Sequence, residues 1–120
     1  MRPQQTGKFM QSSPSFLSSA AHPWKDLGGG VSRQVLGYNA DLMIVLFRFE
    51  KGGVGAPHHH VHSQSAVVQS GVFELTINGE KNVLHPGDGY FVEPNVEHSA
   101  ICLVDGVLID AFSPARMDFL

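Results

Sequence analysis

Ala56-Pro57-His58-His59-His60-Val61-His62-Ser63-Gln64 contains four of the seven histidines of this chain. The run follows a glycine-rich turn at residues 52–55 and leads into the apolar segment 66–68, a context unlike that of an expression tag. Side chains alternate between the faces of an extended strand, so one face would carry His58, His60, His62 and Gln64, and the other His59. Two imidazoles spaced two residues apart can bind one metal ion, which predicts a metal site. A solvated polar strand edge or a hydrogen-bonded histidine cluster is the alternative.

The ligand set of this predicted site needs residues from elsewhere in the chain. A divalent ion in a histidine-rich site prefers imidazole nitrogen at about 2.1 Å and, in a catalytic site, keeps one position open. His58 and His60 would supply two nitrogens, and Gln64 a carbonyl oxygen. His98 is the candidate for the fourth ligand because it follows the loop at 94–97 and opens a predicted strand. His62 is an alternative ligand on the same face; no ligand role is expected for His22, His59 and His85.

The composition limits the classes of function. The 120 residues suit one domain, and 42% hydrophobic residues with a formal net charge of -3 are typical of a soluble globular protein without a nucleic-acid partner. No apolar run approaches the roughly 20 residues of a membrane span, and residues 9–21 are too polar for a secretory signal. Cys102 is the only cysteine and is expected in the core, so no intrachain disulfide is possible and a cytoplasmic location is expected.

The chain divides into an arm and one folded domain. Residues 1–23, rich in Ser, Gln and Pro, are predicted to form a flexible N-terminal arm, and residues 24–120 the domain. Strands are expected over 31–36, 42–50, 72–77, 80–84, 90–92, 99–104 and 107–112, with a type I′ turn at Asn78-Gly79 and a turn at Asp105-Gly106. Many short strands and no helical period predict an all-β barrel or double-sheet jelly roll.

The segment 42–50 carries apolar residues on both faces. It is therefore expected to be buried on both sides, by sheet packing or by a partner subunit. This strand and the arm exceed what one small barrel needs, which predicts a homodimer.

Two motifs together resemble those of the cupin family. The first runs from Gly55 through the histidines to Gly71, and the second comprises Pro86-Gly87-Asp88 and Pro94-Asn95-Val96-Glu97-His98. The resemblance covers about residues 24–120 and implies a single-domain cupin β-barrel, or double-stranded β-helix jelly roll. It implies metal ligands at His58, His60, Gln64 and His98. Many cupins have glutamate in place of Gln64; a neutral amide leaves the charge of the ion uncompensated, which favours Lewis-acid chemistry on an anionic substrate.

A closer resemblance is to the small pectin-degradation cupins of the KdgF type. It rests on His-x-His-x-His-x-Gln, on Asn78-Gly79-Glu80, on the second motif and on the ending from Asp110 to Leu120. The resemblance implies ring opening of 4,5-unsaturated uronates, released by pectate or alginate lyases, towards a linear keto sugar acid. It also implies functional roles for Asp110, Phe112 and Arg116.

The local sequence, without the resemblance, also suggests roles for these three residues. Asp110 has only apolar neighbours, so an ionised carboxylate there is costly, and it is a candidate general acid or base; a buried salt bridge with Arg48 or Arg116 is the alternative. The planar fork of Arg116 suits a substrate carboxylate, although a surface cation would fit too. Phe112 should share the face of Asp110 and could wall a sugar pocket or simply fill the core.

The expected function is that of a metal-dependent isomerase or lyase-type enzyme acting on a small anionic sugar. The donor set could accept zinc, nickel, manganese, iron or cobalt. Two rival hypotheses use the same site: an Fe(II)-dependent cupin oxygenase, and a non-catalytic module that binds sugar or metal.

Overall fold

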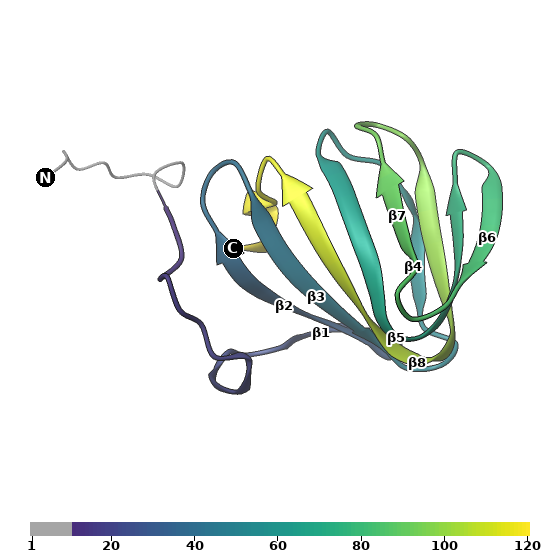
Figure 1. Cartoon of the computed structure of the whole chain (residues 1–120), viewed down its shortest axis with the longest axis horizontal. Helices are drawn as coiled ribbons and strands as arrows, with labels where there is room; N and C mark the ends of the chain where they lie inside the picture. The colour runs from purple at the N-terminus through teal and green to yellow at the C-terminus, as the bar shows by residue number, and fades with distance from the viewer. Residues whose placement is uncertain (1–10) are drawn as a thin grey trace, which may run out of the picture.

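A computed structural model of the chain describes residues 11–120. Residues 1–10 of the predicted arm lie outside the described residues. The order of elements is η2 (Ser19–Ala21), β1 (Lys25–Gly28), β2 (Val31–Tyr38), β3 (Met43–Phe49), β4 (Val54–His58), β5 (Ser63–Ile77), β6 (Glu80–Leu84), β7 (Gly89–Val92), β8 (His98–Ser113) and η3 (Met117–Phe119) (Figure 1). This confirms the all-β prediction. Within the described residues, no helix has the length and apolar character needed to cross a membrane.

The long strands β5 and β8 organise the sheet. They pair antiparallel from Ser63↔Ser113 to Ile77↔His98 and run together through the middle of the molecule (Figure 1). The first half of β5 also pairs with β7 and its second half with β6, whereas β8 pairs with β4 near its start and β3 near its end. Because each long strand changes partner along its length, the two layers of the jelly roll are parts of the same strands.

The predicted turn at Asp105-Gly106 is wrong, because β8 continues through it. The backbones of β5 and β8 approach each other unusually closely at this point. A Cβ added to Gly71 would lie 2.5 Å from the carbonyl oxygens of Val104 and Asp105. Gly71 also has φ of +79°, and the register of β5 against β8 shifts around it. The Asp-Gly pair therefore marks an irregularity inside a strand, for which the same residues serve as well as for a turn.

The predicted hairpin at Asn78-Gly79 is confirmed. Ile77 pairs with Glu80, and the two turn residues have φ of +50° and +82°, as a type I′ turn requires.

The histidine run is not one strand, contrary to the prediction. β4 ends at His58 and β5 begins at Ser63, so residues 59–62 form the connection between them. The backbone of this connection is fixed by the second motif, since the N–H of Asn95 donates to the carbonyl oxygen of His60 at 2.7 Å. A tertiary hydrogen bond replaces the ladder bonds that a strand would have supplied.

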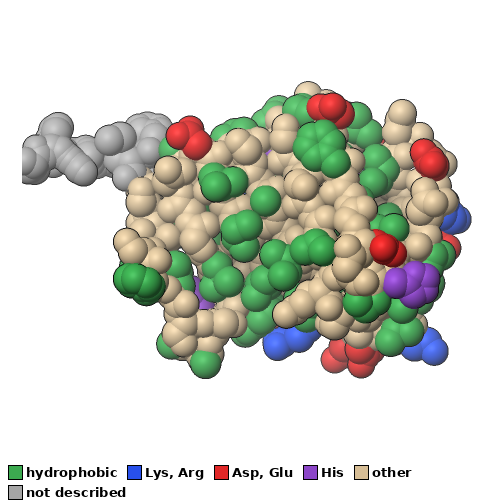
Figure 2. Space-filling view, viewed as in Figure 1, with side chains coloured by type: hydrophobic (Ala, Val, Ile, Leu, Met, Phe, Trp, Pro, Cys, Tyr) green, Lys and Arg blue, Asp and Glu red, His purple; other side chains and the backbone are tan. Residues whose placement is uncertain are grey.

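Within the single chain, sheet packing buries only one face of segment 42–50, so burial of the other face by a partner subunit stays a prediction. Met43, Val45 and Phe49 of β3 are buried, but the alternate face is half-exposed, and Leu42 beside it is 52% exposed. Figure 2 shows hydrophobic side chains over the middle of one face of the molecule, with charged side chains nearer its rim. Met43 and Val45 pack with Phe112 and Ala115 in one core cluster, whereas Phe49 belongs to the other.

The described part of the predicted arm lies along β2. The N–H of Ser13 donates to the carbonyl of Tyr38 at 2.8 Å. The buried amide of Gln34 donates to the carbonyls of Ser19 and His22 at 2.8 and 3.0 Å. Flexibility of the arm and a domain boundary at residue 24 stay predictions.

Close approach of β5 and β8 predicts different costs for two glycine substitutions. Gly79→Ala meets no atom and should lower the free energy of unfolding by about 1–2 kcal/mol, the cost of a left-handed backbone with a Cβ. Gly71→Ala adds a clash with the backbone of β8 and should lower it by about 3 kcal/mol or more. Urea unfolding of both variants checks this, and equal losses would contradict the close approach.

Candidate metal centre

Three histidines converge from different elements. His58 ends β4, His98 begins β8 and pairs with His58 across the sheet, and His60 lies in the connection to β5. One ring nitrogen from each lies within 4.8 Å of the others. The ring centroids are 4.3 Å apart for His58 and His98, 4.9 Å for His60 and His98, and 5.5 Å for His58 and His60. Neighbouring strands thus bring together imidazoles that are distant in the sequence.

Backbone carbonyls fix the tautomer of all three rings. The Nδ1 atoms lie 2.8 Å from the carbonyl oxygen of Ala56 for His58, 3.2 Å from that of His62 for His60 and 2.9 Å from that of Val96 for His98. A carbonyl oxygen can only accept, so each Nδ1 carries the proton and donates. Each Nε2 of a neutral ring is therefore left with a lone pair, as in metal-binding histidines.

For His98 and His60, burial disfavours protonation of the lone pair. It lowers the pKa of His98 to about 4, with smaller contributions from His58 and His60. The pKa of His60 is lowered first by burial and then by the charge of Arg116. Among residues 11–120, Nε2 of His98 is buried and has no hydrogen-bond partner. An orphaned buried acceptor is costly, and a bound cation would satisfy it.

Gln64 completes the donor set from the start of β5. Its side-chain Nε2 donates to Oδ2 of Asp110 at 3.2 Å, which orients the amide oxygen toward His60. That oxygen lies 3.1 Å from Nε2 of His60. Neither atom has a proton when His60 is neutral and protonated on Nδ1, so the two lone pairs face each other. This arrangement suits a cation, and three imidazole nitrogens with one amide oxygen fit a divalent metal ion.

Asp110 is a buried carboxyl group with neutral neighbours. It is 2% exposed and accepts from Gln64 and, at 3.4 Å, from the hydroxyl of Tyr90. Burial raises the pKa of Asp110 to about 7, against the hydrogen bonds of Tyr90 and Gln64, which lower it. Burial also raises the pKa of Tyr90 well above its usual value, so the Tyr90 hydroxyl keeps its proton.

Within residues 11–120, Asp110 forms no salt bridge, so the alternative predicted for it is wrong. The guanidinium of Arg48 lies 4.0 Å above the ring of Trp24. Arg116 instead forms a bidentate ion pair with Asp118, at 3.1 Å from Nε and 3.0 Å from Nη2. Arg116 nevertheless contributes a weak charge effect that lowers the pKa of Asp110.

Phe112 connects the histidines with Arg116. It is 2% exposed, its ring centroid lies 5.8 Å from that of His60, and the guanidinium carbon of Arg116 lies 5.1 Å from it. Phe112 is thus both a core residue and part of the site.

One cavity of about 400 Å³ unites most of the predicted site. Its lining includes His58, Gln64, His98, Asp110, Phe112 and Arg116, together with Tyr90 and Phe119. The volume suits a small ligand such as a monosaccharide. All three predicted catalytic residues and three of the four predicted ligands therefore face one space.

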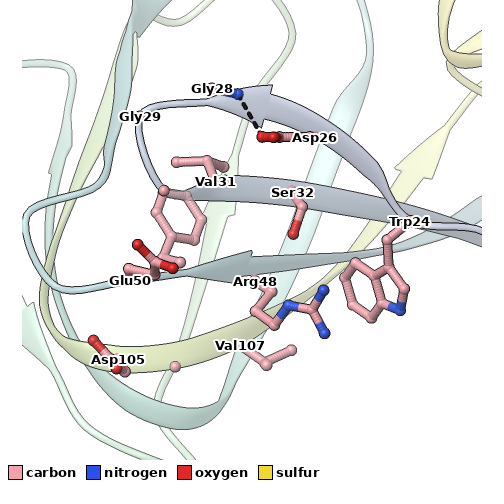
Figure 3. A pocket seen from close by; sticks show the side chains of 13 residues that line it. Trp24, Asp26, Gly28, Gly29, Val31, Ser32, Arg48, Glu50, Asp105 and Val107 are labelled. Carbon is pink, nitrogen blue, oxygen red and sulfur yellow. Dashed lines mark hydrogen bonds between the residues drawn. The ribbon is translucent and has the colours of Figure 1, made fainter.

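A second hollow of about 810 Å³ has a different lining. Figure 3 shows Trp24 and Arg48 at one end and Glu50 and Asp105 at the other. Its lining includes no histidine, and the Asp26 carboxylate accepts from the N–H of Gly28 at 2.9 Å (Figure 3). It offers none of the convergent lone pairs of the histidine site.

Of the remaining histidines, His62 lies beside the triad formed by His58, His60 and His98, with 5.3 Å between its ring centroid and that of His60. His62 faces Phe112 edge-on, 6.4 Å between centroids, and is not one of the three converging histidines. His59 and His85 are exposed. Cys102 is 1% exposed in the main core cluster, as expected.

Sequence reasoning missed Tyr90 and Asp118. Tyr90 reaches Asp110 because Ala66, its partner on β5, pairs with Asp110 on the other side; no local motif indicates this. Asp118 lies two residues after Arg116, and that spacing was the available signal.

We predict that each chain binds one divalent ion through His58, His60 and His98. Zinc affinity should fall at least about tenfold in His98→Ala, because one nitrogen ligand is lost. His59→Ala, in the same run but exposed, is the matched control and should bind as the wild type does. Titration calorimetry after removal of metal by chelation measures both, with elemental analysis of protein purified without added metal. Equal effects of the two substitutions would contradict the assignment.

Comparison with known proteins places the chain among its relatives. The model of the cupin domain family matches residues 45–109. The pectin degradation protein KdgF of Dickeya dadantii (strain 3937) is 47% identical over 100 residues, which cover 82% of this chain and 91% of that protein.

Solved structures agree. An RmlC-like cupin from Shewanella frigidimarina NCIMB 400 is 46% identical with a TM-score of 0.90, covering 92% of this chain and 100% of that one. KdgF from Halomonas sp. is 39% identical with a TM-score of 0.86, covering 90% and 100%. A salicylate 1,2-dioxygenase from Pseudaminobacter salicylatoxidans, 23% identical with a TM-score of 0.69 over 75% of this chain and 28% of that one, shares the fold alone. The chain belongs to the cupin family and, within it, to the KdgF group of pectin degradation proteins.

Proposed function

We propose that this protein is an enzyme that opens the ring of 4,5-unsaturated uronates from pectin or alginate breakdown, giving a linear keto sugar acid. One observation carries the proposal: a single cavity is lined by imidazoles that could hold a metal ion, a buried carboxyl group without an ion pair, and a guanidinium group. Membership of the KdgF group supports the choice of substrate.

His58, His60, Gln64 and His98 would hold the metal in this proposal. When bound there, a divalent ion supplies Lewis-acid polarisation of substrate oxygens. The neutral amide of Gln64 leaves the site with excess positive charge, which favours an anionic sugar. Zinc, nickel, manganese, iron and cobalt all suit these donors.

The reaction moves one proton and breaks one ring bond. In the unsaturated sugar, the ring oxygen is attached to C5 of the C4–C5 double bond. Breaking its bond to C1, with loss of the proton of the C1 hydroxyl, gives an aldehyde and an enolate at C5. Protonation at C4 then gives the ketone and removes the conjugated double bond.

Asp110 is the residue proposed to carry this proton. A carboxyl group with a pKa of about 7 is both an adequate base and an adequate acid near neutral pH. The donors Gln64 and Tyr90 hold its two oxygens in place. Arg116 would bind the sugar carboxylate, and Phe112 would form an apolar wall of the cavity.

Loss of the conjugated alkene absorbance of lyase-generated unsaturated galacturonate measures the activity. Asp110→Asn should lower kcat by about 10²–10⁴-fold, because the amide cannot exchange a proton, and Asp41→Asn on the exposed surface should leave it unchanged.

Three outcomes separate the hypotheses. No acceleration by metal-loaded wild type over the spontaneous reaction would refute the proposal. Oxygen uptake coupled to substrate loss would favour the Fe(II) oxygenase. Sugar binding without turnover, unaltered in metal content by Asp110→Asn, would favour the non-catalytic module.

We also propose that the protein is a homodimer. Ile44 and Leu46 leave the outward face of β3 half-exposed, and Leu42 beside it is exposed. The neighbouring strand β2 carries the described part of the arm. An apolar sheet face of this kind is commonly covered by a second subunit.

Light scattering should therefore give twice the mass of one chain. Ile44→Glu should shift the protein to monomer, because it places a charge in the proposed interface. Val83→Glu, on exposed β6, serves as the control and should not. A monomeric wild type would refute the homodimer.

A further inference from the structure

The C-terminal turn η3 forms one edge of the catalytic cavity. It is anchored at Ala115, which is 2% exposed and whose N–H donates to the carbonyl of Ala40 at 3.1 Å. The turn closes when the N–H of Phe119 donates to the carbonyl of Arg116 at 2.9 Å. Phe119 and Arg116 both line the cavity. The segment after β8 is therefore packed structure at the site.

The guanidinium of Arg116 is held along one edge by an ion pair and on one face by an aromatic ring. Its Nε and Nη2 donate to the two carboxylate oxygens of Asp118. Its central carbon lies 4.2 Å from the ring centroid of Phe119, within cation–π distance. A guanidinium has five N–H donors in a rigid plane. Because Nε and Nη2 each use one N–H on Asp118, three donors are left for a ligand in the cavity, two on Nη1 and the second one on Nη2, and together they form the other edge of the guanidinium.

Phe119 is itself fixed from several sides. The guanidinium carbon of Arg33 lies 3.8 Å from its centroid, and the rings of Phe47 and Phe112 meet it edge-to-face at 6.2 and 5.9 Å. The two arginines share one aromatic ring, and the carboxylate of Asp118 opposes their mutual repulsion. Burial lowers the pKa of Arg33, the charge of Asp118 acts against this, and the charge of Arg116 lowers the pKa further.

Stability is a weak explanation for the pair of Arg116 and Asp118. The side chain of Asp118 is 60% exposed, and that of Arg116 is 13% exposed. Ion pairs with a solvated partner contribute little to folding. A fixed direction for Arg116 is the larger consequence of this contact, because a preorganised donor loses less rotamer entropy on binding a ligand.

We infer that Asp118 and Phe119 are positioning residues that hold Arg116 for recognition of a sugar carboxylate, and so determine the preference for uronates over neutral sugars. The inference rests on the proposed function, since it takes Arg116 as the group that binds the carboxylate. Asp118 fixes the edge of the guanidinium and Phe119 its plane, while Arg33 supports Phe119 from outside the cavity lining.

Kinetics and binding together test the inference. Asp118→Ala should raise KM for unsaturated galacturonate about five- to tenfold and leave kcat within about twofold, because the loss falls on orientation before chemistry. By NMR titration, the Kd for D-galacturonate should rise by the same factor, and that for neutral D-galactose should not change. Phe119→Leu should show the same pattern, and Arg116→Ala should abolish the preference for galacturonate. Asp41→Asn is the matched control.

Several outcomes would overturn it. A KM and Kd of Asp118→Ala equal to those of the wild type would show that Asp118 does not position Arg116. A lower KM would show that Asp118 competes with the sugar carboxylate. If Asp118→Ala unfolds, two other variants decide the question. Phe119→Leu should raise KM and Kd as described, and the isosteric Asp118→Asn should have KM and Kd values between those of the wild type and those expected for Asp118→Ala.

The binding measurements separate this inference from the proposed function. A wild type that prefers galacturonate to galactose without ring opening would refute the proposed function alone, and the Kd ratios of the variants would still decide the role of Asp118. A wild type without that preference would refute the inference even if ring opening occurs.

Discussion

The antiparallel pairing of β5 with β8 is the constraint on which the site depends. It sets Gln64 opposite Phe112 and Ala66 opposite Asp110, and β8 begins with His98. A slip of one residue would turn all these side chains to the other face. The close approach at Gly71 keeps the register shifts of the two strands in one place. The strand pairing that packs the sheet therefore also places the chemical groups of the site.

The site combines polar groups, of which Gln64, His98 and Asp110 are buried, with very few compensating charges. The three imidazoles donate to backbone carbonyls and are left with lone pairs, while Asp110 receives only neutral donors. Such a set is costly unless a ligand completes it. The guanidinium of Arg116 lies at the edge of the cavity, and one of its edges is already hydrogen-bonded to Asp118. The arrangement is typical of a binding site, in which some stability is exchanged for preorganised chemistry.

Local chemistry made part of this predictable from the sequence. Asn78-Gly79 determines its hairpin through left-handed backbone that few other residues adopt, and the place of His98 between the loop at 94–97 and a predicted strand made it a candidate ligand. Asp105-Gly106 misled because a turn and a strand irregularity use the same residues. The histidine run misled because a hydrogen bond from Asn95 decides its conformation. Tyr90 was missed because only the pairing of three strands brings it to Asp110.

The hydrogen bond from Asn95 to His60 has a consequence for engineering. Surface connections usually tolerate insertions, because their length is uncoupled from the rest of a protein. Here the connection at 93–97 is hydrogen-bonded to the main chain of His60, a proposed metal ligand, and Asn95 adopts φ of +66° at this point. Grafts or added epitopes in this connection would displace an imidazole, although they would touch no buried side chain of the core. The tip of β5 and β6 at Asn78-Gly79, open to solvent, is the more permissive place for them.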